Sequence, residues 1–260
     1  VKVDGTEVKE GLYYTKEFEW VSDHPMDCQE TFVSKLVEMN RDTLYGKRLE
    51  LEKARSVDEY QKRVPIHDYH AIGKYIKLIM SGKRDVLFRG KPIWWAKTSG
   101  TTSEAKLIPV TGEMTEYFSD TGSRLLYSFI MENPKNNVNV LSGKLLYLRA
   151  PSTTGYLNGI PAGYISGITG ETQSRFAKRM VVPRKEVSQL ADWEEKFYRT
   201  ILETVGENVT MIVGVTPLLM SMFQRMADEY PERLTRELRK EQTKEKVRKA
   251  LKKGQGRLLP

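Results

Sequence analysis

The chain has 260 residues, 39% of them hydrophobic and 10% aromatic, a composition that supports a folded core and excludes a disordered protein. Its one cysteine, Cys28, excludes an internal disulfide and predicts a reducing, cytoplasmic compartment, and no apolar run is long enough to span a membrane. The net charge of +8 is local, because eleven Lys or Arg and only four acids lie after Pro231.

Residues 1–84 are predicted to be a helical segment that packs on the main domain. Apolar residues share one face of a helix over residues 25–39. Ser56 opens a capping box that starts a short helix. Asp68 is a suitable N-cap for a helix over residues 69–80, which Gly82 ends.

Residues 85–260 alternate predicted strands and helices. Strands are expected over residues 85–88, 93–97, 106–110, 145–149 and 209–213, the last of them buried. Helices are expected over residues 112–131, capped by Thr111, and over residues 192–205, 217–230 and 232–253, whereas residues 151–170 are expected to be irregular. This alternation predicts an α/β fold with a layered, largely parallel sheet flanked by helices.

The basic segment after Pro231 has two interpretations. Glu alternates with Lys and Arg at i, i+4 spacings, which favours a solvated helix over a nucleic-acid patch. We therefore expect no nucleic-acid partner, and the scattered His and Cys residues do not group into a predicted metal site.

The loop between residues 97 and 106 carries the strongest functional signal. It gathers five hydroxyl side chains, one glycine and Lys106 between two apolar segments, and such a loop can surround phosphate oxygens with donors. A solvated turn is the alternative interpretation. The loop is not a Walker A or Rossmann motif, because it has one glycine and a strand follows it.

The order Thr98-Ser99-Gly100-Thr101-Thr102, followed by Lys106, resembles the phosphate loop of acyl-adenylate-forming enzymes. The surrounding sequence resembles one branch, the auxin-responsive Gretchen Hagen family of acyl-acid amido synthetases, and especially its microbial members. The supporting segments are residues 43–46, 64–69, 106–111, 125–128, 142–144, 159–163 with 166–167, 192–196 and 214–217. The resemblance implies the N-terminal portion of the large domain of such an enzyme.

The resemblance also implies a reaction and a set of site residues. ATP, with magnesium, would adenylate a small carboxylic acid, and the acyl group would pass to an amine such as an amino acid. Residues expected at the phosphates are Thr98, Ser99, Gly100, Thr101, Thr102 and Ser103. Lys106 either assists them or is a strand lysine pointing to solvent.

The acyl pocket is expected among residues that follow the loop or strand ends. These candidates are Tyr117, Arg124, Thr153, Thr154, Val215 and Thr216. Arg124 either faces the substrate carboxylate or is an ordinary surface residue.

The chain departs from the family pattern in two ways. Its phosphate loop is shorter by about one residue, and the later nucleotide motifs and the lid are absent. We therefore expect an N-terminal fragment that is inactive alone, with magnesium ligands and catalytic residues beyond Pro260; a genuinely short protein is the alternative. Thioester formation with coenzyme A and a non-catalytic binding remnant remain alternative functions.

Overall fold

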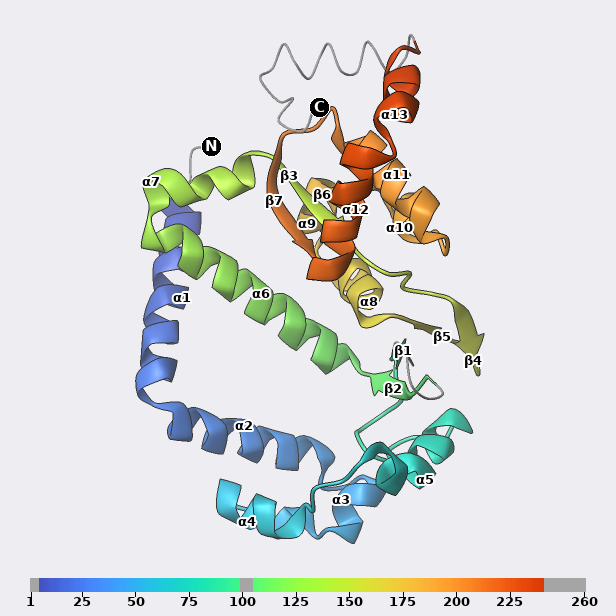
Figure 1. Ribbon diagram of the computed structural model, residues 1–260. Helices are drawn as coiled ribbons and strands as arrows, with labels where there is room; N and C mark the ends of the chain where they lie inside the picture. The colour runs from blue at the N-terminus through green and yellow to red at the C-terminus, as the bar shows by residue number, and fades with distance from the viewer. Residues whose placement is uncertain (1–4, 99–104, 241–260) are drawn as a thin grey trace. The chain divides into compact units, whose positions relative to one another are not determined.

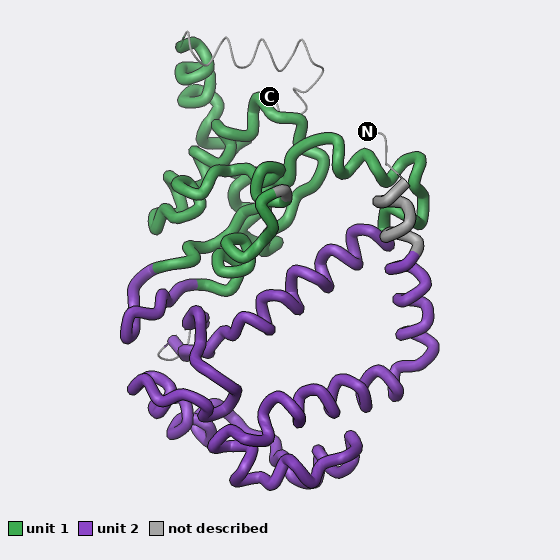
Figure 2. The backbone as a smooth tube through the Cα atoms, turned by 180° about the vertical axis from the view of Figure 1, so that it is seen from behind, with its two compact units in different colours: residues 1–8, 129–153, 164–260 green, residues 9–128, 154–163 purple. Residues whose placement is uncertain are grey.

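The computed structural model describes residues 5–98 and 105–240, which divide into two compact units (Figure 2). Unit 1 holds residues 1–8, 129–153 and 164–260, and unit 2 holds residues 9–128 and 154–163. Both units are discontinuous in sequence, because the chain leaves unit 1 after Thr153 and returns to it at Tyr164.

Unit 2 is mostly helical (Figure 1). Its helices are α1 Gly5–Asp23, α2 Pro25–Asn40, α3 Leu44–Arg48, η1 Leu51–Lys53, α4 Val57–Arg63, α5 Tyr69–Met80 and α6 Gly112–Glu132, of which α1 begins and α6 ends in unit 1. The predicted caps are confirmed: Ser56 accepts from the Glu59 N–H, and Asp68 from the Ala71 N–H at 2.8 Å. Gly82, with φ of 94°, ends α5 in a Schellman motif.

The sheet of unit 2 has four short strands in the order β2-β1-β5-β4. They are β1 Trp94–Lys97, β2 Leu107–Val110, β4 Gly155–Leu157 and β5 Ile160–Gly163. Only β1 and β5 run parallel, so the prediction of a largely parallel sheet is wrong for this sheet. Trp95 of β1 is buried with Ile76 and Ile79 of α5, which forms the core beneath this sheet.

Residues 85–88 are not the predicted strand. Their backbone instead forms hydrogen bonds with the N-terminus of α3. The Asp85 and Val86 carbonyls accept hydrogen bonds from the N–H groups of Leu44 and Tyr45. Asp85 has a φ of 54° and exchanges hydrogen bonds with Gly90, which closes the segment into a loop. The apolar pattern therefore reflects burial of Val86, not strand pairing.

Residues 151–170 are more regular than predicted. Strands β4 and β5 form a hairpin around Asn158 and Gly159, whose φ angles of 48° and 75° are those that a two-residue turn requires. Helix α8 Ile165–Thr172 follows. An Asn-Gly pair is typical of a hairpin turn, but the many Gly, Thr and Pro residues around it favoured the prediction of an irregular segment.

Unit 1 has a three-stranded parallel sheet in the order β6-β3-β7, as expected for an α/β fold. Its strands are β3 Lys144–Leu148, β6 Val181–Val182 and β7 Val209–Gly214, and its further helices are α7 Pro134–Asn137, η2 Val138–Ser142, α8, α9 Arg175–Met180, α10 Lys185–Ser188, α11 Trp193–Thr204, α12 Thr216–Asp228 and α13 Pro231–Leu238. The expectation that β7 is buried is wrong, because it lies at the edge of the sheet that the described residues form, with Ile212 44% exposed.

Helices cover both faces of this sheet. Leu146 and Leu148 point into a core formed with Phe197 and Ile201 of α11 and Met222 of α12. The Tyr147 side chain, which alternation places on the opposite face, donates to the Ser166 carbonyl of α8 at 3.0 Å. Strand β3 is therefore held between helices on its two faces.

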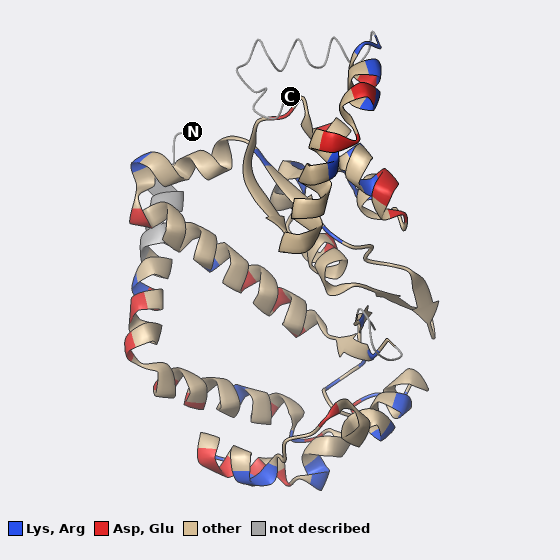
Figure 3. Ribbon diagram, viewed as in Figure 1, with Lys and Arg blue, Asp and Glu red and all other residues tan. Residues whose placement is uncertain are grey.

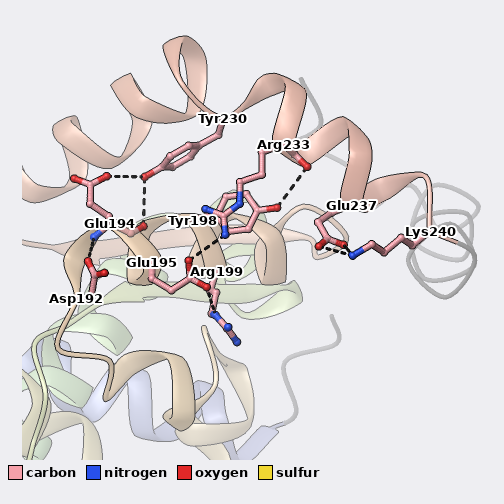
Figure 4. Close-up of polar contacts among 9 residues, drawn as sticks. All are labelled: Asp192, Glu194, Glu195, Tyr198, Arg199, Tyr230, Arg233, Glu237 and Lys240. Atoms are coloured by element: carbon pink, nitrogen blue, oxygen red, sulfur yellow. Dashed lines mark hydrogen bonds and ion pairs between the residues drawn. The ribbon is translucent and has the colours of Figure 1, made fainter.

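Helix α13 is attached to α11 by a network of charged and aromatic side chains (Figure 4). The Glu195 carboxylate accepts from Arg199 at 2.6 Å and from Arg233 at 3.1 Å, and these cations hold the pKa of Glu195 below its usual range. The Arg233 guanidinium also lies 3.4 Å from the centre of the Tyr198 ring. Basic and acidic residues interleave on α13 (Figure 3), as the solvated-helix interpretation expects for the described part of this segment.

Helix α11 depends on its N-cap. The Asp192 carboxylate accepts from the Glu194 N–H at 2.9 Å. Asp192→Ala is expected to lower the free energy of unfolding by about 1 kcal/mol, because a helix-terminal donor loses its partner. Asp192→Asn, which keeps an acceptor, should cost much less; equal losses in urea denaturation would contradict the capping role.

Candidate functional site

The predicted phosphate loop joins β1 to β2 and is closed by hydrogen bonds at its base. The Thr98 N–H donates to the Lys106 carbonyl at 3.1 Å, and the Lys106 N–H donates to Thr98 Oγ1 at 3.0 Å. Ser99, Gly100, Thr101, Thr102 and Ser103 lie outside the described residues. The described ends therefore form a hairpin base from which the hydroxyl-rich residues continue.

Lys106 is half-buried beside the base of the loop. Its Nζ lies 5.5 Å from the centre of the Tyr69 ring, a cation–π contact. The Tyr69 hydroxyl donates to the Leu107 carbonyl at 3.0 Å and accepts from the Leu107 N–H at 3.1 Å. The ring thus connects α5 to the start of β2 and lies against the lysine.

Tyr117 and Arg124 are both on α6 but have different surroundings. Tyr117 is 64% exposed and touches the edge of Phe32. Arg124 is bonded to Asp120, with Nε 2.8 Å from Oδ2, and to Glu17 of α1, and it lies over the Tyr14 ring. These carboxylates, Glu17 first, raise the pKa of Arg124. Its role toward a substrate carboxylate stays a prediction, and such a substrate would have to compete with both acids.

The remaining acyl-site candidates fall in both units. Thr154 is in unit 2 and donates through its N–H and hydroxyl to the Ala162 carbonyl, at 2.7 and 3.2 Å. Thr153, Val215 and Thr216 are in unit 1.

Within unit 1, neighbouring strand ends bring these residues to one edge. Leu148 of β3 pairs with Gly214 of β7, so the segments holding Thr153 and Val215 leave the same carboxyl edge of the sheet, where open α/β sheets bind ligands. The segment that holds Thr153 is bonded to Gln189, whose side-chain amide donates a hydrogen bond to Ser152 Oγ at 2.9 Å.

Comparison with known proteins gives a family. A model described as the GH3 family N-terminal domain matches residues 14–257. This chain belongs to the GH3 family. A probable indole-3-acetic acid-amido synthetase GH3.1 of Arabidopsis thaliana is 31% identical over 140 residues, which are 52% of this chain and 22% of that protein.

Solved structures of GH3 proteins share the fold. One, a GH3.15 acyl acid amido synthetase, matches 86% of this chain and 40% of its own with a TM-score of 0.70 at 19% identity. Another, of AtGH3.15 acyl acid amido synthetase in complex with 2,4-DB, matches 92% and 41% with a TM-score of 0.71 at 20% identity. The chain therefore spans about two fifths of these GH3 structures, and they support the α/β layout with helices around the sheets.

The described residues of the GH3 chain include two buried cations, whose burial the sequence did not indicate. Arg149 follows β3 and is 7% exposed, and Lys196 of α11 is 1% exposed. Lys196 Nζ lies 4.1 Å from the centre of the Trp193 ring and 3.4 Å from the Arg149 carbonyl oxygen. Lys196 belongs to the family-like segment at residues 192–196, but its helical position alone did not distinguish a buried lysine from an exposed one.

Burial lowers the pKa of Lys196 to about 8, and this has a consequence for stability. In the unfolded state this lysine keeps its ordinary pKa near 10.5. Between pH 8 and pH 10.5 the unfolded state therefore binds more protons than the folded state, and the free energy of unfolding rises with pH. Below pH 8 the folded protein carries the full cost of a buried charge, partly offset by the Trp193 ring.

Lys196→Met is therefore expected to raise the free energy of unfolding at pH 7 by about 1–3 kcal/mol, since one pKa unit corresponds to about 1.4 kcal/mol. The difference in the free energy of unfolding between the variant and the wild type should shrink as the pH rises from 8 toward 10.5. Urea denaturation of both proteins at pH 7 and at about pH 9.5 measures it. An unchanged gap, or a less stable variant at pH 7, would contradict this account of Lys196.

Two kinds of feature are absent from the described residues of the GH3 chain. In the ranges 5–98 and 105–240, His, Cys, Asp and Glu do not gather in groups of three or more that could hold a metal. The described helices include none with the length and apolar character needed to cross a bilayer.

Proposed function

We propose that this GH3 chain is the part of an ATP-dependent acyl acid amido synthetase that holds the nucleotide phosphates and part of the acyl substrate. The observation that carries the proposal is the closed base at Thr98 and Lys106, from which a hydroxyl-rich loop continues. The proteins to which this chain is similar are named as amido synthetases, which supports an amide-forming reaction for this chain.

The proposed chemistry has two steps. A carboxylate oxygen of the acid attacks the α-phosphate of ATP, the bond to the β-phosphate breaks and pyrophosphate leaves. The amine nitrogen then attacks the acyl carbonyl, loses a proton and displaces AMP. The first step places charge on phosphate oxygens, and fixed donors stabilise such charge best.

The residues present fit the phosphates better than they fit magnesium. Hydroxyls, a glycine and Lys106 are the donors that a polyphosphate needs, and Thr98 and Lys106 place the loop ends together. Magnesium prefers carboxylate and phosphate oxygens, and the described residues offer no carboxylate cluster for it. We therefore assign no residue of this chain to the metal.

Carboxylate-dependent exchange of pyrophosphate into ATP tests the first step. The protein as its gene encodes it should incorporate labelled pyrophosphate into ATP when it is given an acid from a panel of aryl and indole carboxylates. It should then form an amide between that acid and an amino acid. Exchange followed by a thioester with coenzyme A would favour the ligase alternative. Nucleotide binding without exchange on any acid would favour a non-catalytic role.

A triple loop variant sharpens this test. Converting Ser99, Thr101 and Thr102 to Ala should abolish most of the exchange, whereas Ser123→Ala on the exposed face of α6 should leave it unchanged. Equal exchange in the two variants would remove the loop from the proposal.

A further inference from the structure

Arg149 is a buried cation whose hydrogen bonds are incomplete. Among the described residues, its Nε and Nη1 atoms find no hydrogen-bond partner, although both are shielded from solvent. Burial lowers the pKa of Arg149, yet a guanidinium stays protonated in proteins. A charge buried with unmade bonds is unfavourable, so the fold retains Arg149 at a cost to stability.

Arg149 is one of the residues that line a cavity of about 300 Å³ at the edge of the unit 1 sheet. The cavity lies beside β6, which pairs in parallel with β3, near the carboxyl ends of both strands. The fold makes room for the guanidinium with Gly170 of α8, because a Cβ there would lie 1.9 Å from Arg149 Nη1. Gly170 and Arg149 thus form one wall of the cavity together.

The charges around the cavity are unequal. Four basic and two acidic side chains line it. Glu171 attracts Arg149 but is bonded to Lys185 at 2.9 Å, and Arg184 is bonded to Glu203 outside the cavity. Lys178 has no ion pair among the described residues. Once the two ion pairs are set aside, Arg149 and Lys178 stand against Glu186, which leaves a small excess of positive charge around the cavity.

We propose that this cavity is a binding site for an oxyanion group, a phosphate or a carboxylate, of a small molecule. Arg149 supplies a positive charge and a planar guanidinium of the kind that binds such groups, and the exposed Lys178 adds a mobile charge. The site uses none of the residues assigned to ATP or to the acyl substrate, so it does not depend on the proposed function.

Titration with inorganic phosphate, and separately with acetate, tests the site at constant ionic strength made up with chloride. Thermal unfolding and calorimetry are expected to show saturable binding of at least one anion, since a ligand of the folded state raises the unfolding temperature. Binding of phosphate alone or of acetate alone identifies the preferred group. Absence of saturable binding of both anions would overturn the proposal.

Three variants locate the anion. Arg149→Met should abolish binding, and Lys178→Met, at an exposed position, should weaken it at least about threefold. Arg199→Met, at an arginine paired with Glu195 on the exposed side of α11, should bind as wild type does. If Arg149→Met does not fold, Lys178→Met decides alone.

A second phosphate site at the loop gives a distinguishable result. Phosphate held there would still bind to Arg149→Met and Lys178→Met and would be lost in the triple loop variant. That pattern would overturn the inference about Arg149 while leaving the proposed function intact. The reverse pattern would support the Arg149 site alone.

Discussion

Gly167→Ala is expected to lower the free energy of unfolding by about 3 kcal/mol, an overpacking cost at the upper end of the usual range. Gly167 of α8 lies directly on the backbone that follows β3. A Cβ at this position would be 2.4 Å from both the Ala150 carbonyl oxygen and the Ser152 nitrogen. Backbone atoms cannot rotate away as a side chain can, so α8 has to move off the segment that leads to Thr153.

Urea denaturation measures this effect, with Gly122→Ala as the matched control. Gly122 is an exposed position of α6, and a Cβ there would meet no heavy atom within 4 Å. The control should gain up to about 1 kcal/mol from helix propensity. A similar gain for Gly167→Ala would show that α8 does not pack on residues 150–152 as described.

Thr98→Val is expected to reduce carboxylate-dependent pyrophosphate exchange by about 10- to 100-fold, because small displacements of groups that hold a substrate have effects of this size. Valine keeps the shape of threonine but removes Oγ1, the acceptor for the Lys106 N–H. The base of the loop then keeps the bond from the Thr98 N–H to the Lys106 carbonyl but loses the second of its two hydrogen bonds, while the sheet beneath it keeps its packing. The unfolding temperature should change little.

Thr98→Ser separates the hydroxyl from the methyl group. Serine keeps the acceptor, so its exchange rate should stay close to that of the wild type. The assay uses the protein as its gene encodes it, with each variant checked by thermal unfolding. Equal exchange by Thr98→Val and Thr98→Ser would show that closing the loop at its base is unimportant for the reaction.

The predictions that the structure confirmed rest on short-range chemistry. The caps at Ser56 and Asp68 and the end of α5 at Gly82 were visible because each involves partners within about four residues. The helix after Thr111 was visible for the same reason: its hydroxyl accepts from the Met114 N–H. The family-like loop was recognised as a run of residue types, and its residues 99–104 lie outside the described structure.

The predictions that failed depended on distant partners. Residues 85–88 have the composition of a strand, but their carbonyls are used by Leu44 and Tyr45 of α3. Strand β7 is apolar and was expected to be buried, but it pairs only with β3 in the described sheet and lies at an edge. The division of the chain at residue 84 stays a prediction.

The sequence by itself determined where several of the helices begin and end, the α/β class and the family, because these depend on local spacing and on residue identity along the chain. Only the tertiary structure decided which cations are buried, that Lys196 lies against the Arg149 carbonyl after β3 and that Arg149 lines a cavity beside Gly170. The physical reason is that desolvation and unmade hydrogen bonds arise from residues that are far apart in sequence and meet only after folding.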